Sequence, residues 1–248
     1  MGTPVRPRND PAQYDDLADH WWDERGRFAM LHWIAEARAG LVPPAVRDGA
    51  LLLDLACGGG LLAPHLAGKG YRHVGLDLSS TALRTAREHG VVPVRGDVLR
   101  LPFGDEVADV VVAGEILEHV SDLPRAVAEA CRVLRPDGTL VVDTIAATWW
   151  GRFSSITVGE RIPAGPPPRL HDADLFVDRG VLRREAARAG VRLTLVGLRP
   201  SARDYLGWLG GRRATVRMLP TRSTAGLFQA VGTKLARKTE DDRKGPPR

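Results

Sequence analysis

The chain has 248 residues, a formal net charge of +5 and a hydrophobic fraction of 44%, values typical of a single globular domain. It contains no apolar run near the roughly 20 residues that a membrane span needs, and its first residues lack the apolar core of a signal peptide. Two cysteines, Cys57 and Cys131, argue against a disulfide framework and favour a reducing, cytoplasmic location. The positive charge permits a nucleic-acid or anionic-membrane partner without by itself indicating one.

Composition predicts disorder at both ends, in residues 1–10 and 234–248, where proline, arginine and mixed charges replace apolar periodicity. The remaining residues, 11–233, are expected to form one domain. Its first part, residues 11–39, has the apolar spacing of one or two helices and includes two adjacent tryptophans. These helices either complete the core or form a lid over a ligand cleft.

Strand-like and helix-like segments alternate from residue 50 onward. Short runs rich in Val and Leu predict five parallel strands, at residues 50–56, 73–77, 91–94, 109–113 and 139–143. Helices are expected between or after them, at residues 61–69, 79–89, 122–135 and 178–189. Residues 191–233 add two closing antiparallel strands, at 191–198 and 226–232. The expected fold is a Rossmann-like, doubly wound α/β domain with a mostly parallel seven-stranded sheet and helices on both faces.

Acidic and glycine residues lie at the predicted strand ends, where ligands bind in such sheets. The first strand ends in Asp54-Leu55-Ala56-Cys57-Gly58-Gly59-Gly60, and glycines allow a ligand to lie directly against the backbone. Asp77 closes the second strand and suits the hydroxyls of a ribose, while Asp97 closes the third and suits an exocyclic amine of adenine. A single acidic residue there is often only a helix cap or turn former, but three successive strand ends are harder to explain in that way.

Two cofactors compete for this site. The segment from Gly58 to Ala63 matches the loose dinucleotide-binding fingerprint, which would indicate NAD. A pyrophosphate, however, would be repelled by Asp54. S-adenosylmethionine has no phosphate and carries an amino group and a sulfonium, so the acidic cleft favours it.

Residues 50–145 resemble the class I S-adenosylmethionine-dependent methyltransferases. The resemblance rests on Asp-x-x-Cys-Gly-Gly-Gly, on the Gly-Leu-Asp strand end and on the Arg-Pro-Asp-Gly that precedes the fifth strand. It implies a cofactor-binding core with ten contact residues: Arg38, Asp54, Ala56, Gly58, Gly60, Asp77, Leu78, Asp97, Val98 and Gly114. Ala56 stands where the family more usually has glycine, and we expect it to be tolerated if that position needs no positive φ.

A narrower resemblance, across residues 14–178, is to the ubiquinone-biosynthesis O-methyltransferases, which methylate polyprenylated catechols and phenols. It is carried by Leu17-Ala18-Asp19-His20-Trp21-Trp22-Asp23, by Leu31-His32 and Arg38, by the segment Gly114–Val120, and by His171-Asp172. The resemblance implies that Arg38 reaches the methionine carboxylate and that Gly114 lies in the cofactor site. It also implies a small phenolic or catecholic acceptor.

Glu115, Glu118 and His119 form a separate candidate cluster. If a helix begins here, the three side chains share one face and suit a divalent ion. Members of the resembled family bind magnesium or a similar metal at such a motif. Against a metal, Leu-Glu-His-Val recurs in many class I methyltransferases without one, and acidic residues in a first helical turn also favour the helix dipole. The catalytic candidates are His119, His171 and Glu115, with either histidine as the base that deprotonates a phenol.

Two stretches on the substrate side leave alternatives open. The insertion at residues 145–177 carries Trp149, Trp150, Phe153 and Ile156, which either contact an apolar substrate or a membrane surface peripherally, or pack on the core. The segment between the closing strands is rich in arginine, from Arg199 to Arg222. Such a stretch can hold anionic lipid, an acidic substrate group or RNA, but is usually a solvated face.

The sequence therefore predicts O-methylation of a phenolic or catecholic small molecule, a quinone precursor or a natural-product scaffold. The alternatives are a nucleic-acid or protein methyltransferase and a non-catalytic cofactor-binding module. Base methylation is disfavoured because Gly114-Glu115 follows the fourth strand where an Asn/Asp-Pro-Pro-aromatic signature would stand. We accordingly expect no nucleic-acid partner.

Overall fold

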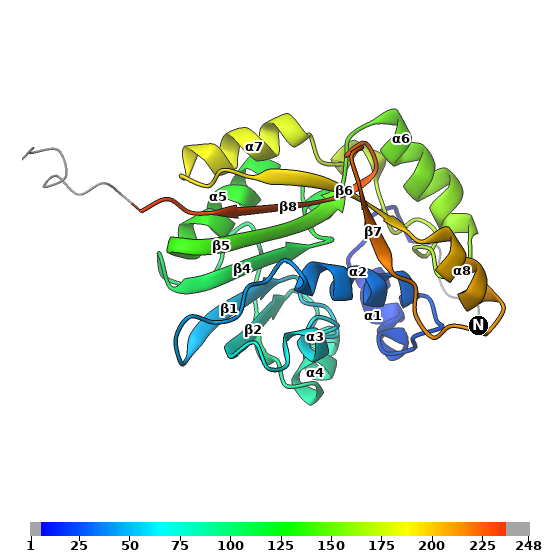
Figure 1. The fold of residues 1–248 in the computed structure, drawn as a ribbon, viewed down its shortest axis with the longest axis horizontal. Coiled ribbons are helices and arrows are strands. Elements are labelled where there is room, and N and C mark those ends of the chain that lie inside the picture. The colour runs from blue at the N-terminus through cyan, green and yellow to red at the C-terminus, as the bar shows by residue number, and fades with distance from the viewer. Residues whose placement is uncertain (1–5, 237–248) are drawn as a thin grey trace, which may run out of the picture.

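The computed structural model describes residues 6–236. Within that range, eight strands form one sheet in the order β3-β2-β1-β4-β5-β8-β6-β7 (Figure 1). The strands are β1 (Ala50–Leu55), β2 (Tyr71–Asp77), β3 (Val92–Arg95), β4 (Ala108–Gly114), β5 (Leu134–Ile145), β6 (Thr194–Pro200), β7 (Met218–Thr221) and β8 (Leu227–Thr233). The first five pair in parallel, whereas β8 runs antiparallel between β5 and β6. The expected doubly wound sheet is confirmed, and β7 extends it by an eighth strand.

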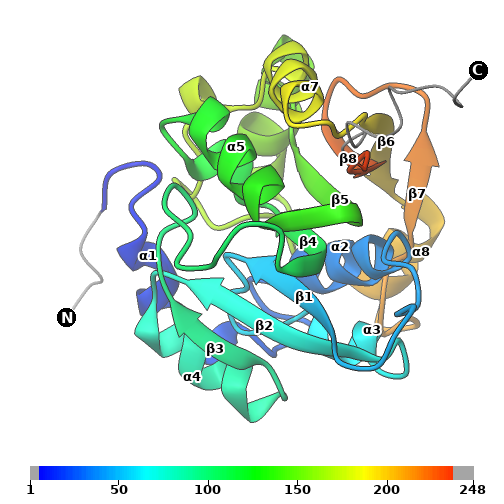
Figure 2. The same cartoon turned by 90° about the vertical axis from the view of Figure 1, so that its left-hand side faces the viewer.

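Helices cover both faces of the sheet. They are α1 (Ala12–Asp16), α2 (Ala29–Ala39), α3 (Ala63–Leu66), α4 (Ser80–Glu88), α5 (Leu123–Val133), α6 (Trp149–Arg152), α7 (Arg179–Arg188) and α8 (Ala202–Leu209). In Figure 2, α5 and α7 lie on one side of β4 and β5, and α2 lies on the other. The crossovers from β1 to β2 and from β2 to β3 run through α3 and α4 on one face, and the crossover from β4 to β5 runs through α5 on the other, because the strand order reverses at β1.

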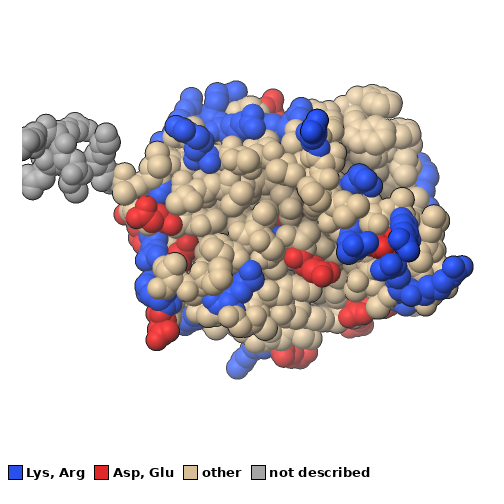
Figure 3. All heavy atoms as spheres, viewed as in Figure 1, with Lys and Arg blue, Asp and Glu red and all other residues tan. Residues whose placement is uncertain are grey.

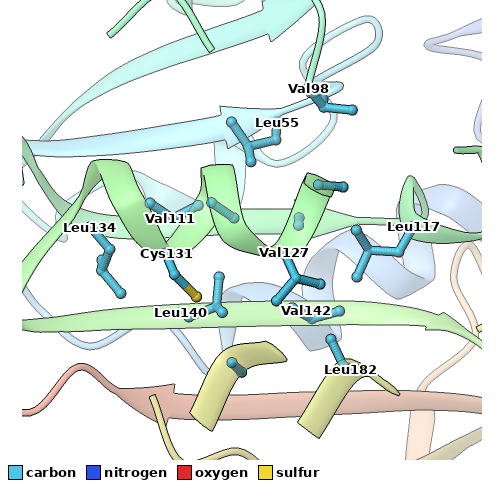
Figure 4. Packing of buried hydrophobic residues seen from close by; sticks show 14 of the residues in the cluster. Leu55, Val98, Val111, Leu117, Val127, Cys131, Leu134, Leu140, Val142 and Leu182 are labelled. Carbon is cyan, nitrogen blue, oxygen red and sulfur yellow. The ribbon is translucent and has the colours of Figure 1, made fainter. Parts of the chain in front are cut away.

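The continuous apolar runs in the strands follow from this burial on both faces. Val111 of β4 packs toward α5 and α7 with Leu140 and Val142 of β5 (Figure 4). Its neighbours Val110 and Val112 point to the opposite face, where they join the cluster with α2 and α3. Because successive side chains of a strand alternate between faces, a strand buried on both needs apolar residues at every position.

Five of the α-helices begin at a side-chain cap that the sequence supplies. The N-capping oxygens of Ser79, Asp122, Thr148, Asp178 and Ser201 each accept a hydrogen bond from a backbone N–H of the first turn. Each such bond satisfies a donor that would otherwise lack a partner within the helix. Three of these helices, α4, α5 and α7, lie within one or two residues of the predicted bounds.

Two predicted boundaries were wrong. The helix expected at 61–69 shrinks to α3, because turns follow Gly60, whose φ is +82°. The fifth strand begins at Leu134 rather than at residue 139. Pro136-Asp137-Gly138, which separates the predicted helix at 122–135 from the predicted strand at 139–143, lies within β5, next to a register shift between Ala108 and Val110 on β4. A bulge of this kind absorbs extra residues without ending the strand.

The arginine-rich stretch between the closing strands forms more structure than its composition indicates. It contains α8 and then β7, which pairs antiparallel with β6. The carboxylate of Asp204 is fully buried and is contacted by Arg213 and Arg217, with N–O distances of 3.3 and 2.6 Å. Other Lys and Arg side chains spread over the end of the molecule near α8 and β7 (Figure 3). Two arginines of the basic stretch are thus ion-paired with Asp204 of α8, beside the edge strand β7.

The ends of the described chain are more ordered than expected. Residues 6–10, predicted to be disordered, contact the substrate-side insertion: Arg8 donates to Glu160 at 2.7 Å and to the carbonyl oxygen of His171 at 2.8 Å. Lys234, also placed in a disordered tail, is buried and donates to the carbonyls of Cys131 and Leu134. Residues 1–5 and 237–248, the rest of the predicted tails, lie outside the described residues. Between residues 6 and 236, no helix combines the length and apolar character needed to cross a membrane.

Candidate functional site

A cavity of about 790 Å³ opens at the carboxyl ends of β1, β2 and β4. Its wall includes Asp54, Gly58 and Asp77 on one side and His119 and His171 on the other. The exposed wall of this cavity is mostly apolar. The cofactor candidates and the catalytic candidates of the sequence therefore border one continuous space.

The glycine turn after β1 is fixed from both sides. Gly58 has a φ of +52°, and its N–H donates to Asp77 Oδ2 at 2.9 Å. The second oxygen of Asp77 accepts from the N–H of Ser79 at 2.8 Å. Burial raises the pKa of Asp77, although these two N–H donors oppose the shift. Each oxygen still has a lone pair, so ligand hydroxyls can donate to Asp77.

Ala56 adopts a φ of +56°. The prediction that alanine is tolerated in place of glycine depends on the absence of a positive φ at residue 56. The observed φ is positive, so that condition is not met. Left-handed backbone costs a non-glycine residue on the order of 1 kcal/mol or more. The chain accepts this strain one residue after β1, on the wall of the cavity.

Trp21 covers the glycine turn. A Cβ atom added to Gly58 would lie 2.4 Å from the Trp21 ring, and one added to Gly59 would lie 2.6 Å from it. The expectation that a ligand rests directly on this backbone is thus only partly right, because the missing side chains make room for the indole. Trp21 stacks on Phe28 at 4.5 Å and on Tyr14 at 5.9 Å between ring centroids. The N-terminal helices therefore cover the cofactor end of the cavity.

Arg38 and Gly114 meet in the interior. The Nε and Nη2 atoms of Arg38 donate to the two carboxylate oxygens of Asp143 at 2.6 and 2.7 Å, a bidentate pair buried in the protein. Within residues 6–236 no hydrogen bond uses Nη1, so this group can meet a ligand carboxylate. A Cβ atom on Gly114 would lie 2.0 Å from the guanidinium carbon. Glycine at this position is what allows Arg38 to cross the end of β4.

The remaining cofactor candidates also line the cavity. Asp54 is buried and faces His73, whose Nε2 lies 3.2 Å from Asp54 Oδ2. Asp97 Oδ1 accepts from the N–H of Leu99 at 2.8 Å, so it is a turn former as well as part of the wall. Leu78 is exposed and Val98 is buried, and both border the space. Of the ten sequence candidates, only Gly60 is not part of the wall.

The acidic and histidine candidates do not lie on one helix face. Residues 117–119 form a single 3₁₀ turn instead of the start of a helix. One ligand atom each from Glu118, His119 and His171 lie within 4.8 Å of one another. That group includes His171 where the sequence argument placed Glu115. The Glu115 carboxyl is buried nearby, and its Oε1 has no hydrogen-bond partner among residues 6–236.

Burial sets the protonation of this cluster. It raises the pKa of Glu115 well above its usual value and that of Glu118 to about 7. It lowers the pKa of His119 well below 6.5 and that of His171 to about 4. Both imidazoles are therefore neutral at pH 7 and can accept a proton or ligate a metal. The Thr144 hydroxyl donates to Glu118 at 2.7 Å, which favours the carboxylate.

Sequence reasoning missed three residues that contact the candidates. Asn9 and Tyr14 both reach the His119 ring, and Asp143 holds Arg38. Asp143 ends a predicted strand, so its position was a usable signal. Asn9 lay in a predicted tail 110 positions from His119, and no local pattern joins the two.

Comparison with known proteins agrees with this geometry. The family model described as "Methyltransferase domain" matches residues 53–142. The ubiquinone biosynthesis O-methyltransferase of Cupriavidus pinatubonensis is 33% identical over 205 residues, covering 77% of this chain and 82% of that protein. The chain belongs to the class I S-adenosylmethionine-dependent methyltransferases. The protein of the same name from a Methylobacterium species is 32% identical over 213 residues, covering 77% and 86%.

A solved structure supports the fold of this methyltransferase. An S-adenosylmethionine-dependent methyltransferase from Thermotoga maritima superposes with a TM-score of 0.64 at 21% identity, covering 90% of this chain and 96% of that one. The residues on the cavity wall fit the cofactor that the family implies. Asp77 can accept from hydroxyls, Arg38 Nη1 can meet a carboxylate, and the buried Trp21 Nε1 has no hydrogen-bond partner among residues 6–236.

Proposed function

We propose that this methyltransferase transfers a methyl group to the oxygen of a phenolic or catecholic small molecule. The observation that carries the proposal is the single cavity, because it joins the cofactor wall at Asp77 to two neutral histidines, His119 and His171. The relatives with the name ubiquinone biosynthesis O-methyltransferase support an oxygen acceptor. The apolar wall suits an acceptor that is planar and largely apolar.

S-adenosylmethionine, when bound, supplies an electrophilic methyl group. The protein's part is to position the acceptor and to remove its proton, since a phenol with a pKa near 10 is a poor nucleophile at pH 7. His119 Nε2 lies 3.3 Å from the Tyr14 hydroxyl, and this contact with a phenolic oxygen supports the proposal that Nε2 meets the acceptor. A proton taken up by His119 is stabilised by the nearby Glu118 carboxylate.

A divalent ion is the second way in which this cluster would activate the oxygen. Glu118, His119 and His171 offer one carboxylate and two neutral imidazoles, a donor set suited to a divalent metal. Glu115, included in the sequence-based metal set, lies outside that group and would act through its charge or through a bridging water. With an ion in place, these residues would hold it beside the acceptor and lower the pKa of the phenol.

The test is an assay of the purified protein with a panel of catechols and simple phenols. We expect methylated product from at least one catechol. Asp77→Ala should abolish most turnover and weaken binding of S-adenosylhomocysteine in calorimetry by about 10- to 100-fold, because a hydrogen bond to a charged group is worth roughly 1.5–3 kcal/mol. Loss of turnover in EDTA and its recovery with magnesium would assign the metal; unchanged turnover in EDTA would leave His119 as the base.

Two results would contradict the proposal. Methylation of RNA or of a peptide without any catechol product would indicate that the acceptor is a nucleic acid or a protein. Tight S-adenosylhomocysteine binding with no transfer to any acceptor would indicate a cofactor-binding module. An inactive Asp77→Ala variant that binds S-adenosylhomocysteine like the wild type would show that Asp77 does not contact the cofactor.

A further inference from the structure

The side chain of Asn9 clamps His119 at two points. Its amide Nδ2 donates to the carbonyl oxygen of His119 at 3.0 Å, and its Oδ1 lies 2.5 Å from His119 Nδ1. Asn9 also borders the cavity. Both contacts come from one planar amide, so the ring and the backbone of residue 119 are held together.

The pair of contacts determines which nitrogen of His119 carries the proton. If the amide were turned over, its oxygen would face the carbonyl oxygen of His119, and neither atom has a hydrogen to donate. The amide oxygen must therefore face Nδ1, and a carbonyl oxygen only accepts. Nδ1 consequently carries the hydrogen, which leaves the lone pair on Nε2, where the Tyr14 hydroxyl donates at 3.3 Å.

We propose that Asn9 is a positioning residue that holds neutral His119 as the Nδ1–H tautomer, with the Nε2 lone pair facing the cavity, where the hydroxyl of the methyl acceptor would replace that of Tyr14. The consequence for turnover rests on the proposed function, whereas the tautomer itself does not. A buried neutral imidazole with its hydrogen on Nε2 could neither accept a proton from the acceptor nor ligate a metal there. The clamp serves both accounts of His119, since a metal ligand also needs its second nitrogen fixed.

The backbone conformation of Asn9 and the contacts of its neighbours position this side chain beside His119. Asn9 has a φ of +58°, a conformation that asparagine accepts more readily than most residues. Its N–H donates to the carbonyl of Arg169 at 3.1 Å, and the preceding Arg8 is bonded to Glu160 and to the carbonyl of His171. The N-terminal segment (dark blue beside α1 in Figure 2) is thus anchored to the insertion at Arg8 and at Asn9 itself.

The experiment compares Asn9→Gly with Asn9→Asp in the full chain. Glycine accepts the positive φ but removes the clamp, and aspartate keeps an oxygen for Nδ1. With ¹⁵N-histidine labelling, long-range ¹H–¹⁵N spectra report the tautomer of each neutral imidazole, and His119→Gln assigns the signal. We expect the Nδ1–H tautomer in the wild type and in Asn9→Asp, and its loss in Asn9→Gly.

Turnover provides the second readout. Asn9→Gly should lower kcat by about 10- to 100-fold, the usual loss when the partner of a functional histidine is removed, with the KM for the cofactor unchanged. Asn9→Asp should recover much of that loss. Arg6→Ala is the control for loosening of the segment. Within residues 6–236 the Arg6 side chain donates hydrogen bonds only to Asp10 and Asp16, so this substitution should change neither the tautomer nor kcat.

The inference is overturned if His119 carries its hydrogen on Nε2 in the wild type, or if Asn9→Gly leaves the Nδ1–H tautomer intact. The spectra are recorded without acceptor, so they are independent of the proposed function. If the tautomer responds to substitution of Asn9 but the protein methylates no phenol, the role of Asn9 is supported and the proposed acceptor is wrong. If the protein methylates a catechol but the tautomer does not respond, the proposed acceptor is supported and the role of Asn9 is wrong.

Discussion

Two residues that directly follow a strand on the cavity wall, Ala56 after β1 and Glu115 after β4, have positive φ angles of 56° and 51°. Neither is glycine, so each stores conformational strain at the end of a strand that faces the ligand space. At Glu115 the backbone is held by a hydrogen bond from its N–H to the carbonyl of Asp143 at 2.9 Å. Strain of this kind persists where neighbouring contacts fix the chain, and here it aims both residues at the same cavity.

The strain at Ala56 can be measured directly. Ala56→Gly should raise the free energy of unfolding by about 0.5–1 kcal/mol, because glycine adopts positive φ without steric cost and this gain exceeds its entropic penalty. In a protein of this size that change raises Tm by roughly 1–4 °C. Thermal and urea unfolding provide the measurement.

A matched control for that substitution lies in α7. Ala187 is exposed within a regular helix, where glycine costs about 1 kcal/mol relative to alanine. Ala187→Gly should therefore lower stability while Ala56→Gly raises it. Two losses of the same size would mean that Ala56 is not strained.

At the scale of elements, the sequence predicted what short-range patterns encode. The apolar runs of β1, β4 and β5, the glycine turn and the helices α4 and α5 were readable because each depends on neighbours within a few positions. The α8–β7 pair was missed because its arginines are typical of a solvated basic stretch. In the structure, Arg213 and Arg217 instead form ion pairs with the buried Asp204 of α8. The contact between Asn9 and His119 spans the chain and has no local signature.

The substrate-side insertion carries two adjacent tryptophans with different surroundings. Trp150 borders the cavity, whereas Trp149 is 74% exposed, stacks on Phe153 and is not part of the wall. The sequence could not separate them, because an irregular helical segment gives no clear period: α6 is followed directly by a π-helical turn at residues 153–158. Only the three-dimensional arrangement identifies which ring faces the ligand space.

This difference predicts opposite results for two neighbouring substitutions. Trp150→Ala should raise the KM for the acceptor and lower kcat/KM by about 10-fold, because a half-buried indole contributes roughly 1–2 kcal/mol of apolar contact. Trp149→Ala should stay within about 2-fold of the wild type. Steady-state kinetics with the best catechol provide the test, and an equal effect of both substitutions would show that the insertion rearranges around the acceptor.

At the scale of the whole molecule, the buried cluster makes stability depend on pH through opposing groups. The raised pKa of Glu118, about 7, means that the folded protein binds a proton that the unfolded chain releases above pH 4.5, so this group lowers stability as pH rises toward 7. The lowered pKa values of His119 and His171 act in the other direction. The unfolded chain binds their protons first as pH falls, so these histidines destabilise the fold in acid.

The contribution of His171 can be isolated by comparing pH slopes. Burial lowers its pKa from 6.5 to about 4, so its neutral form supports folding fully above pH 6.5 and progressively less as pH falls toward 4. At about 1.4 kcal/mol per pH unit, the loss between pH 6.5 and pH 5 is at most about 2 kcal/mol. His171→Gln cannot gain a proton, so its urea-unfolding free energy should fall less over that interval than that of the wild type. Equal slopes in the wild type and in His171→Gln would show that His171 titrates alike in the folded and unfolded states.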